Sequence, residues 1–373
     1  MPVSAHSAAQ RIAPDNTNTP GSLACLHSVA WGCHTPEVIF RPMKSPKDDH
    51  TILCWERDSI PALLLNTEMS SILVRDEYPN ALRDIISVAQ CHGDLQQDEP
   101  LEAMEVDRNN RFYNPFVDMP PFSSWYLAAI VLGNSGIGKT MFLYYDLALR
   151  TLAGLPSMLQ LNSEELFVFC NEGVFVLPFP RLSQQIIEFC THIPHFVWVL
   201  VDSTLHPKGV HSTLYELYCS HSAFILQTAS PRWDCTRWRN KTPRPAITFW
   251  ILNSCDTHLW SHQRPPEHQL TLWCKKYGAS ARQAYAYAAH VSLHAPDIAH
   301  LIRSLAVDKN MLTTMLANAC SANVVDERSH DIYVIAPVPG DRMRHEVRFA
   351  IPHLLFALLE QLEAGLNWPR DTA

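Results

Sequence analysis

One stretch of the sequence has the residue types and the spacing that bind the phosphates of a nucleotide. It fits the pattern G-x-x-x-x-G-K-[ST] at every fixed position. In such a loop, backbone N–H groups turn towards the phosphate oxygens, the lysine reaches the β and γ phosphates, and the next hydroxyl lies on Mg²⁺. The pattern therefore predicts a site for a nucleotide and Mg²⁺, formed by Gly133, Asn134, Ser135, Gly136, Ile137, Gly138, Lys139 and Thr140.

The segments on either side of this loop predict the setting that phosphate binding needs. Residues 126–132 are continuously apolar, which is typical of a strand buried on both faces of a sheet. Residues 141–150 are rich in helix formers, and Gly154 follows them as a C-cap. The N-terminus of that helix would direct its partial positive charge at the phosphates. The alternative is a glycine-rich turn between a strand and a helix that binds no ligand.

Two polar residues follow later apolar strands. Asp202 comes directly after the strand predicted over residues 196–201, and ligands of parallel α/β sheets bind beyond the carboxyl ends of the strands. Asp202 would therefore hold the Mg²⁺ shell through water, unless it is an ordinary turn or helix-capping aspartate. Ser230 follows the strand predicted over residues 223–228 and would reach the same sheet edge, where a polar residue can sense the γ-phosphate.

Two basic features could contact a partner. Residues 232–241 interleave arginine with Trp233 and Trp238, and such a segment can hold single-stranded nucleic acid by stacking and phosphate contacts. The alternative is a loop whose tryptophans are buried and whose arginines are solvated. Arg282 lies in the first turn of a predicted helix, where the helix dipole disfavours a cation. Its position indicates an outside partner, such as nucleotide phosphates, or a surface salt bridge.

The composition is that of a globular protein. Of 373 residues, 47% are hydrophobic and 18% are charged, and the net charge of −8 argues against broad nonspecific binding to nucleic acid. The eleven cysteines have no C-x-x-C spacing, and the start of the chain has no signal-peptide pattern. We expect an intracellular protein, cytoplasmic or nuclear. No apolar run approaches the ~20 residues of a membrane-spanning helix, so no membrane partner is expected.

Apolar runs alternate with helical patterns along most of the chain. This alternation predicts an α/β fold in which helices flank a parallel sheet. Asn171, Glu172 and Gly173 separate two of the runs and are typical of a hairpin turn. The predicted strands are residues 71–74, 126–132, 158–161, 166–170, 174–178, 196–201, 223–228, 246–252, 330–335 and 346–349. The predicted helices are residues 76–86, 141–150, 181–191, 209–220, 269–277, 280–293, 297–305, 309–320 and 352–365.

The chain divides into four segments by composition. Residues 1–50 are rich in Ser, Thr, Asn, Pro and His without periodicity, and we expect them to be a mostly disordered leader. Residues 51–110 hold an N-terminal element and an acidic linker. Residues 111–260 form the core with the phosphate-binding loop, and residues 261–373 form a mainly helical region with a small strand pair.

Taken in order, these pieces resemble the P-loop ATPase module of the Crinkler effector and retrotransposon hot spot protein superfamily. The resemblance covers roughly residues 60–350 and rests on residues 72–78, 133–140, 142–145, 200–202, 229–231 and 277–282. It implies an AAA-like P-loop NTPase with a helical C-terminal lid. It also implies that Ser230 occupies the sensing position and that Arg282 is the lid arginine. Ser203 departs from the broader class, whose hydrolytic members usually have a water-activating Glu there.

The sequence therefore predicts an ATP-binding P-loop NTPase that works as a slow ATPase or a nucleotide-dependent switch. Lys139, Asp202, Ser230 and Arg282 would act on the phosphates. The alternative is a degenerate ATP-binding module that presents a protein- or nucleic-acid-binding surface without significant hydrolysis. A small-molecule kinase is less favoured, because a large helical C-terminal region suits a lid or adaptor better than an acceptor pocket. The sequence leaves the oligomeric state open.

Overall fold

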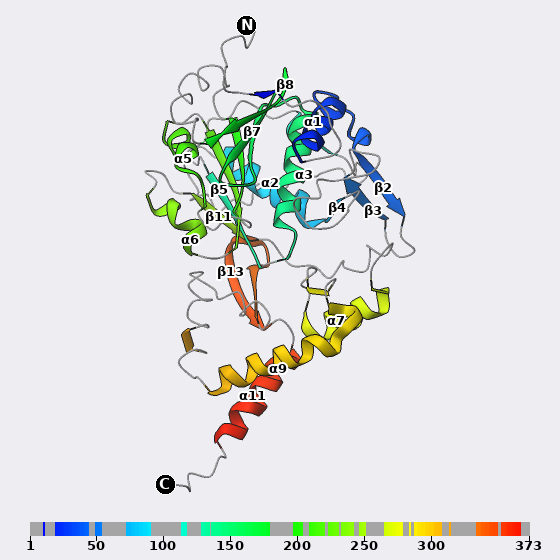
Figure 1. Ribbon diagram of the computed structural model, residues 1–373, viewed down its shortest axis with the longest axis vertical. Helices are drawn as coiled ribbons and strands as arrows, with labels where there is room; N and C mark the ends of the chain where they lie inside the picture. Colours follow the sequence, from blue (N-terminus) through cyan, green and yellow to red (C-terminus); the bar gives the residue numbers. More distant parts are fainter. Residues whose placement is uncertain are drawn as a thin grey trace. The chain divides into compact units, whose positions relative to one another are not determined.

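The computed structural model of the chain is drawn in Figure 1. The chain divides into two compact units. The first unit comprises Met1–Val131, Thr140–Thr228 and Arg237–Thr248, and the second comprises Leu132–Lys139, Ala229–Thr236 and Phe249–Ala373. The structure describes residues 10–11, 19–44, 49–53, 72–90, 113–117, 128–134, 136–179, 197–203, 209–220, 223–230, 233–241, 246–250, 265–278, 283–284, 287–307, 313–314, 333–349 and 352–366.

The largest sheet has eight strands in the order β1-β8-β7-β6-β9-β10-β5-β11. Strands β6, β9 and β10 are parallel, whereas β7, β8 and β1 continue the sheet in antiparallel fashion. The sheet is therefore mixed, and the prediction of a parallel sheet is wrong for this part. The strands are β1 (Gln10–Arg11), β5 (Ala128–Leu132), β6 (Ser157–Gln160), β7 (Glu165–Cys170), β8 (Gly173–Pro178), β9 (Val197–Asp202), β10 (Ala223–Ala229) and β11 (Ile247–Trp250).

A hairpin explains why the sheet is mixed. Cys170 of β7 pairs with Gly173 of β8, so only two residues connect these strands. A connection this short can join antiparallel neighbours, whereas parallel neighbours need a crossover of a dozen or more residues. The hairpin predicted at residues 171–173 is confirmed.

Helices cover both faces of the central strands. Every residue of β9 and of β10 is buried, as expected for strands covered on both sides. Helix α3 (Lys139–Leu152) lies on one side of these strands in Figure 1, and α5 (Ser212–Cys219) lies on the other. The short helices α6 (Trp233–Thr236) and η3 (Arg237–Lys241) follow β10. The fold class is thus α/β, with helices flanking a large mixed sheet.

The N-terminal region is more ordered than expected. Residues 19–44 form α1 (Thr19–Ala30), η1 (Pro36–Val38) and β2 (Phe40–Lys44). Leu23 and Leu26 of α1 are fully buried, and the side chain of His27 hydrogen bonds to the carbonyl oxygen of Cys170 at 2.7 Å. The expectation of a mostly disordered leader is therefore wrong for residues 19–44, because apolar side chains within this polar segment are buried.

A smaller antiparallel sheet follows α1. It has the order β2-β3-β4, with β3 (Asp49–Leu53) and β4 (Ile72–Val74). Helix α2 (Glu77–Gln90) then buries Tyr78 and Ile85. The strand expected at residues 71–74 and the helix expected at residues 76–86 are both confirmed, and the helix is one turn longer at its end.

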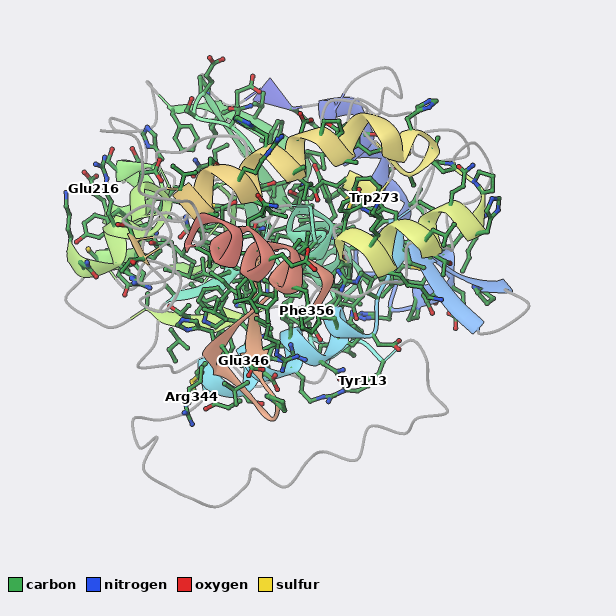
Figure 2. The ribbon with its side chains drawn as sticks, turned by 90° about the horizontal axis from the view of Figure 1, so that it is seen from below. Tyr113, Glu216, Trp273, Arg344, Glu346 and Phe356 are labelled. Carbon is green, nitrogen blue, oxygen red and sulfur yellow. The ribbon has the colours of Figure 1, made fainter. Side chains whose placement is uncertain are left out.

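Among its described residues, the C-terminal region holds helices and one strand pair, which agrees with the predicted elements. Its elements are α7 (Glu267–Tyr277), η5 (Ala288–His290), α9 (Val291–Val307), β12 (Tyr333–Val338), β13 (Asp341–Phe349) and α11 (Pro352–Leu366). In Figure 2, Trp273 of α7 and Phe356 of α11 are labelled; the first is fully buried and the second is 61% exposed. Figure 2 also shows Arg344 and Glu346 on β13.

Some predicted elements fall where the structure gives little or no description. The helix expected at residues 181–191 lies outside the described residues, as does most of the helix expected at 309–320. Of the helix expected at 280–293, residues 283–284 are helical, and a 3₁₀ turn precedes α9. Throughout the described ranges, no helix combines the length and the apolar character that crossing a membrane requires.

Candidate functional site

The predicted loop has the setting that its sequence indicates. Strand β5 leads into it, and α3 begins at Lys139. Gly136 and Gly138 have φ angles of 78° and 91°, a region that residues with a side chain rarely adopt. The glycines therefore permit the turn between strand and helix. Ser135 lies outside the described residues, and Ile137 is buried.

Lys139 is folded back on its own loop. Its side chain is only 3% exposed, and its Nζ atom donates to the carbonyl oxygens of Gly133 at 2.8 Å and of Asn134 at 2.6 Å. Burial of an ammonium group is costly unless polar partners surround it, and these carbonyls supply that compensation. A phosphate at the loop would have to compete with them for the lysine.

The loop also contacts the C-terminal strand pair within the second unit. Asn134 is 4% exposed, and its Oδ1 atom accepts a hydrogen bond from the backbone N–H of Ile335 in β12 at 3.3 Å. His345 of the neighbouring strand β13 packs against Trp250, with 4.7 Å between the centroids of the two rings. Sequence reasoning did not find this contact, because Asn134 and Ile335 are 201 residues apart.

Thr140 and Asp202 meet within the first unit. Asp202 ends β9 and is 1% exposed, and its Oδ2 atom accepts a hydrogen bond from Thr140 Oγ1 at 2.7 Å. Tyr144, one turn further along α3, is also buried. Its pKa is raised well above its ordinary value by burial and, to a lesser extent, by the charge of Asp202. The hydroxyl that follows the predicted lysine therefore lies against the predicted carboxylate.

A hydrogen-bonded chain occupies the position after Asp202. Ser203 is 2% exposed and its Oγ atom accepts a hydrogen bond from Gln227 Nε2 at 2.6 Å. Gln227 Oε1 in turn accepts from Trp238 Nε1 at 2.7 Å. Ser203 therefore lies inside a neutral polar network of hydrogen bonds.

One tryptophan of the basic segment, Trp238, is buried, as the alternative prediction for this segment expects of its tryptophans. Trp238 is 7% exposed and packs edge-on against Tyr218 of α5, with 5.8 Å between ring centroids. Arg239 donates to Thr248 Oγ1 at 3.2 Å, and burial lowers its pKa, while Arg237 is exposed. Trp238 is therefore unavailable to stack on a base. Arg232 and the side chain of Trp233 lie outside the described residues.

Ser230 and Arg282 are the two remaining predicted site residues. Ser230 is half-buried and directly follows β10, the strand that lies between β9 and β5 in the sheet. Arg282 lies outside the described residues. The helix before it ends as expected, because Gly278 has a φ of 91° and its N–H donates to the carbonyl oxygen of Cys274 at 3.0 Å.

The donor atoms around Asp202 fit a hard cation that is shared with a ligand. Mg²⁺ prefers oxygen ligands and is usually bound by one or two carboxylates together with substrate phosphates and water. Thr140 and Asp202 offer a hydroxyl and a carboxylate side by side. Nowhere in the described ranges do three or more His, Cys, Asp or Glu side chains gather as a metal cluster. A metal ion here would therefore need oxygens from a ligand and from water.

Sequence reasoning overlooked two polar residues beside Asp202. Gln227 and Thr228 interrupt the otherwise apolar run of β10, and both are fully buried. Polar residues within a buried strand are unusual unless they have hydrogen-bond partners or a ligand. The two polar residues within this apolar run were therefore the sequence signal that could have identified Gln227 and Thr228 as neighbours of the predicted carboxylate.

Comparison with known proteins shows a distant similarity. No family model matches the chain. Crinkler effector proteins 15 and 16 of Phytophthora infestans are each 29% identical to it over 160 residues. The aligned region is 43% of this chain and 22% of each relative, so it spans about a fifth of their length. The chain is thus weakly similar to Crinkler effector proteins.

Proposed function

We propose that this chain is a P-loop NTPase that binds ATP with Mg²⁺ and acts as a nucleotide-dependent switch with slow hydrolysis. The observation that supports this most directly is the 2.7 Å hydrogen bond between Thr140 and Asp202. It joins the last residue of the phosphate-loop pattern to the carboxylate at the end of a buried strand. A glycine turn that binds no ligand would not require this pairing.

The strand order also supports a ligand site at this edge. β5, which leads into the loop, is separated from the next strand of the large sheet, β6, by β9 and β10. From β5 the chain crosses to β6 on one side of β5, whereas β11 lies on the other side of β5. In open α/β sheets, ligands bind outside the carboxyl ends of the strands where the strand order reverses in this way. An AAA-like arrangement is the form of P-loop NTPase that we propose.

Each residue would contribute charge or position to phosphate binding. The first N–H groups of α3 and the loop backbone would donate to phosphate oxygens, and Lys139 would turn from its two carbonyl partners to the β and γ phosphates. Thr140 and Asp202 would hold Mg²⁺, which neutralises phosphate charge. Ser230 would reach the γ-phosphate, and Arg282 remains a prediction from the resemblance.

Ser203 is the reason for proposing slow turnover. Phosphoryl transfer to water needs a residue that orients or deprotonates the water. A serine hydroxyl that already accepts a hydrogen bond from Gln227 is poorly suited to either task. The same observation favours the second candidate function, a degenerate module that binds ATP without significant hydrolysis and presents a surface to a protein or nucleic-acid partner.

Binding and turnover can be measured on one set of variants. We expect the native chain to bind a fluorescent ATP analogue in the presence of Mg²⁺ and to release phosphate slowly. Lys139→Ala should abolish binding, whereas Lys241→Ala, which removes an exposed lysine of η3 outside the loop, should bind as the native chain does.

The possible outcomes separate the candidate functions. A folded native chain that binds no ATP would refute the proposal. Binding without any phosphate release would select the second candidate. Release that depends on an added acceptor would indicate a kinase.

A further inference from the structure

Thr228 is a buried hydroxyl next to the candidate metal site. It lies in β10 and is 0% exposed, and no group in the described part of the chain forms a hydrogen bond with its Oγ1 atom. A buried polar atom without a partner is unfavourable, so each such case in a folded protein calls for a reason. A ligand or a water that the bound state supplies is one such reason.

The sheet register gives the direction of this side chain. Thr228 pairs with Asp202 across the parallel strands β10 and β9. Paired residues of neighbouring strands point to the same face, and successive residues of one strand point to opposite faces. Gln227 extends to Ser203 and Trp238, on the face covered by α5. Thr228 therefore points to the other face, which is the face of Asp202 and α3.

Residues that carry hydroxyl groups thus lie on the same face as Asp202. Thr140 donates to it at 2.7 Å, Tyr144 follows one turn later on α3, and Thr228 is its neighbour across the sheet. All these residues belong to the first unit. A carboxylate with hydroxyls at its sides can hold water molecules as well as a cation.

We propose that Thr228 is a positioning residue whose Oγ1 atom accepts a hydrogen bond from a water of the Mg²⁺ shell that Asp202 holds. This inference rests on the proposed nucleotide function. Mg²⁺ gives up its waters reluctantly and usually keeps several of them, and each needs hydrogen-bond partners in a closed site. Thr228 offers such a partner at the position of β10 that pairs with Asp202.

The test compares nucleotide binding with and without the metal. Thr228→Val removes the hydroxyl at nearly constant shape, and Thr228→Ser keeps it. We expect Thr228→Val to raise the Mg²⁺ concentration needed for half-maximal ATP binding by about threefold to tenfold, the range for one lost hydrogen bond. Its ATP binding in EDTA should match that of the native chain. Thr228→Ser should restore the Mg²⁺ dependence to within about twofold.

Two controls separate this role from a structural one. Thr151→Val makes the same change at a buried threonine that lies eleven residues after Thr140 and donates to the carbonyl of Leu147 at 2.7 Å; it should not alter the Mg²⁺ dependence. Without ligand, the melting temperature of Thr228→Val should equal or exceed that of the native chain, because the substitution removes a buried hydroxyl that has no hydrogen-bond partner among the described residues.

Each outcome bears on a different claim. If the native chain binds ATP with Mg²⁺ and Thr228→Val has the native Mg²⁺ dependence, the Thr228 inference fails and the proposed function stands. Equal weakening with and without Mg²⁺ would also overturn the inference, since it would show a general structural effect. If the native chain binds no ATP, both fail together.

Discussion

Asp146 makes the stability of this protein depend on pH in an unusual direction. It lies in the middle of α3, it is 0% exposed, and neither of its carboxylate oxygens has a hydrogen-bond partner among the described residues. Arg150, one turn later, donates instead to Ser157 Oγ at 2.8 Å and to the carbonyl of Pro156 at 2.9 Å. Burial therefore raises the pKa of Asp146 to about 7, and the charge of Arg150 offsets only part of that effect.

The sign and size of the effect follow from this pKa. Below the ordinary value of 3.8 the group is protonated in both states, and between 3.8 and about 7 only the unfolded chain loses the proton. The folded state is therefore favoured less as the pH rises through this window, by ~1.4 kcal/mol per pH unit. From pH 5 to pH 8 the contribution of Asp146 falls by about 3 kcal/mol, and the loss is complete once the pH exceeds 7.

Urea unfolding at pH 5 and pH 8 measures this contribution when the native chain is compared with Asp146→Asn. The asparagine cannot ionise, so its free energy of unfolding relative to the native chain should rise by roughly 2–3 kcal/mol between the two pH values. Glu164→Gln, which removes one exposed carboxylate, is the matched control and should differ by no more than about 0.5 kcal/mol at both. An Asp146→Asn difference that is equal at pH 5 and pH 8 would refute the reasoning.

Three further predictions concern the loop and its surroundings. Asp202→Asn keeps the shape but removes the charge that attracts Mg²⁺, so calorimetry should find the same weak ATP binding with Mg²⁺ and with EDTA; a retained metal dependence would contradict this. Gly136→Ala forces a side chain to a φ of 78°, which costs about 1–2 kcal/mol, and we expect a lower melting temperature and weaker ATP binding. Trp238→Phe removes the indole N–H that donates to Gln227 Oε1 within a buried network, and chemical denaturation should give a loss of about 1–3 kcal/mol.

Local sequence patterns predicted the elements around the loop well. The apolar run before Gly133 and the helix formers after Thr140 correspond to β5 and α3. Each end of these two elements lies within two residues of its predicted position. The strand that ends at Asp202 was equally clear. These elements were predictable because burial on both sheet faces requires a continuous apolar run, and a helix needs only local hydrogen bonds.

Contacts between distant segments could not be predicted in this way. No local pattern joins Asn134 to Ile335, and none pairs β6 with β9. The order of α1 also depends on tertiary packing, since Leu23 and Leu26 are buried within an otherwise polar segment. Trp238 is a similar case, because it is buried where its indole N–H donates to Gln227 of β10, eleven residues earlier in the chain.

In our proposal, nucleotide binding and the slow hydrolysis depend on opposite faces of one pair of strands. Asp202 and Thr228 point to the face of α3, whereas Ser203 and Gln227 interact on the face of α5 and Trp238. A glutamate in place of Ser203 would be a carboxylate in a buried site that is already filled by a neutral hydrogen-bonded chain, and burying such a charge is costly. Slow turnover is therefore a property of the whole network behind Asp202 in our proposal, since the neighbours of Ser203 are arranged for a hydroxyl and leave no place for a catalytic carboxylate.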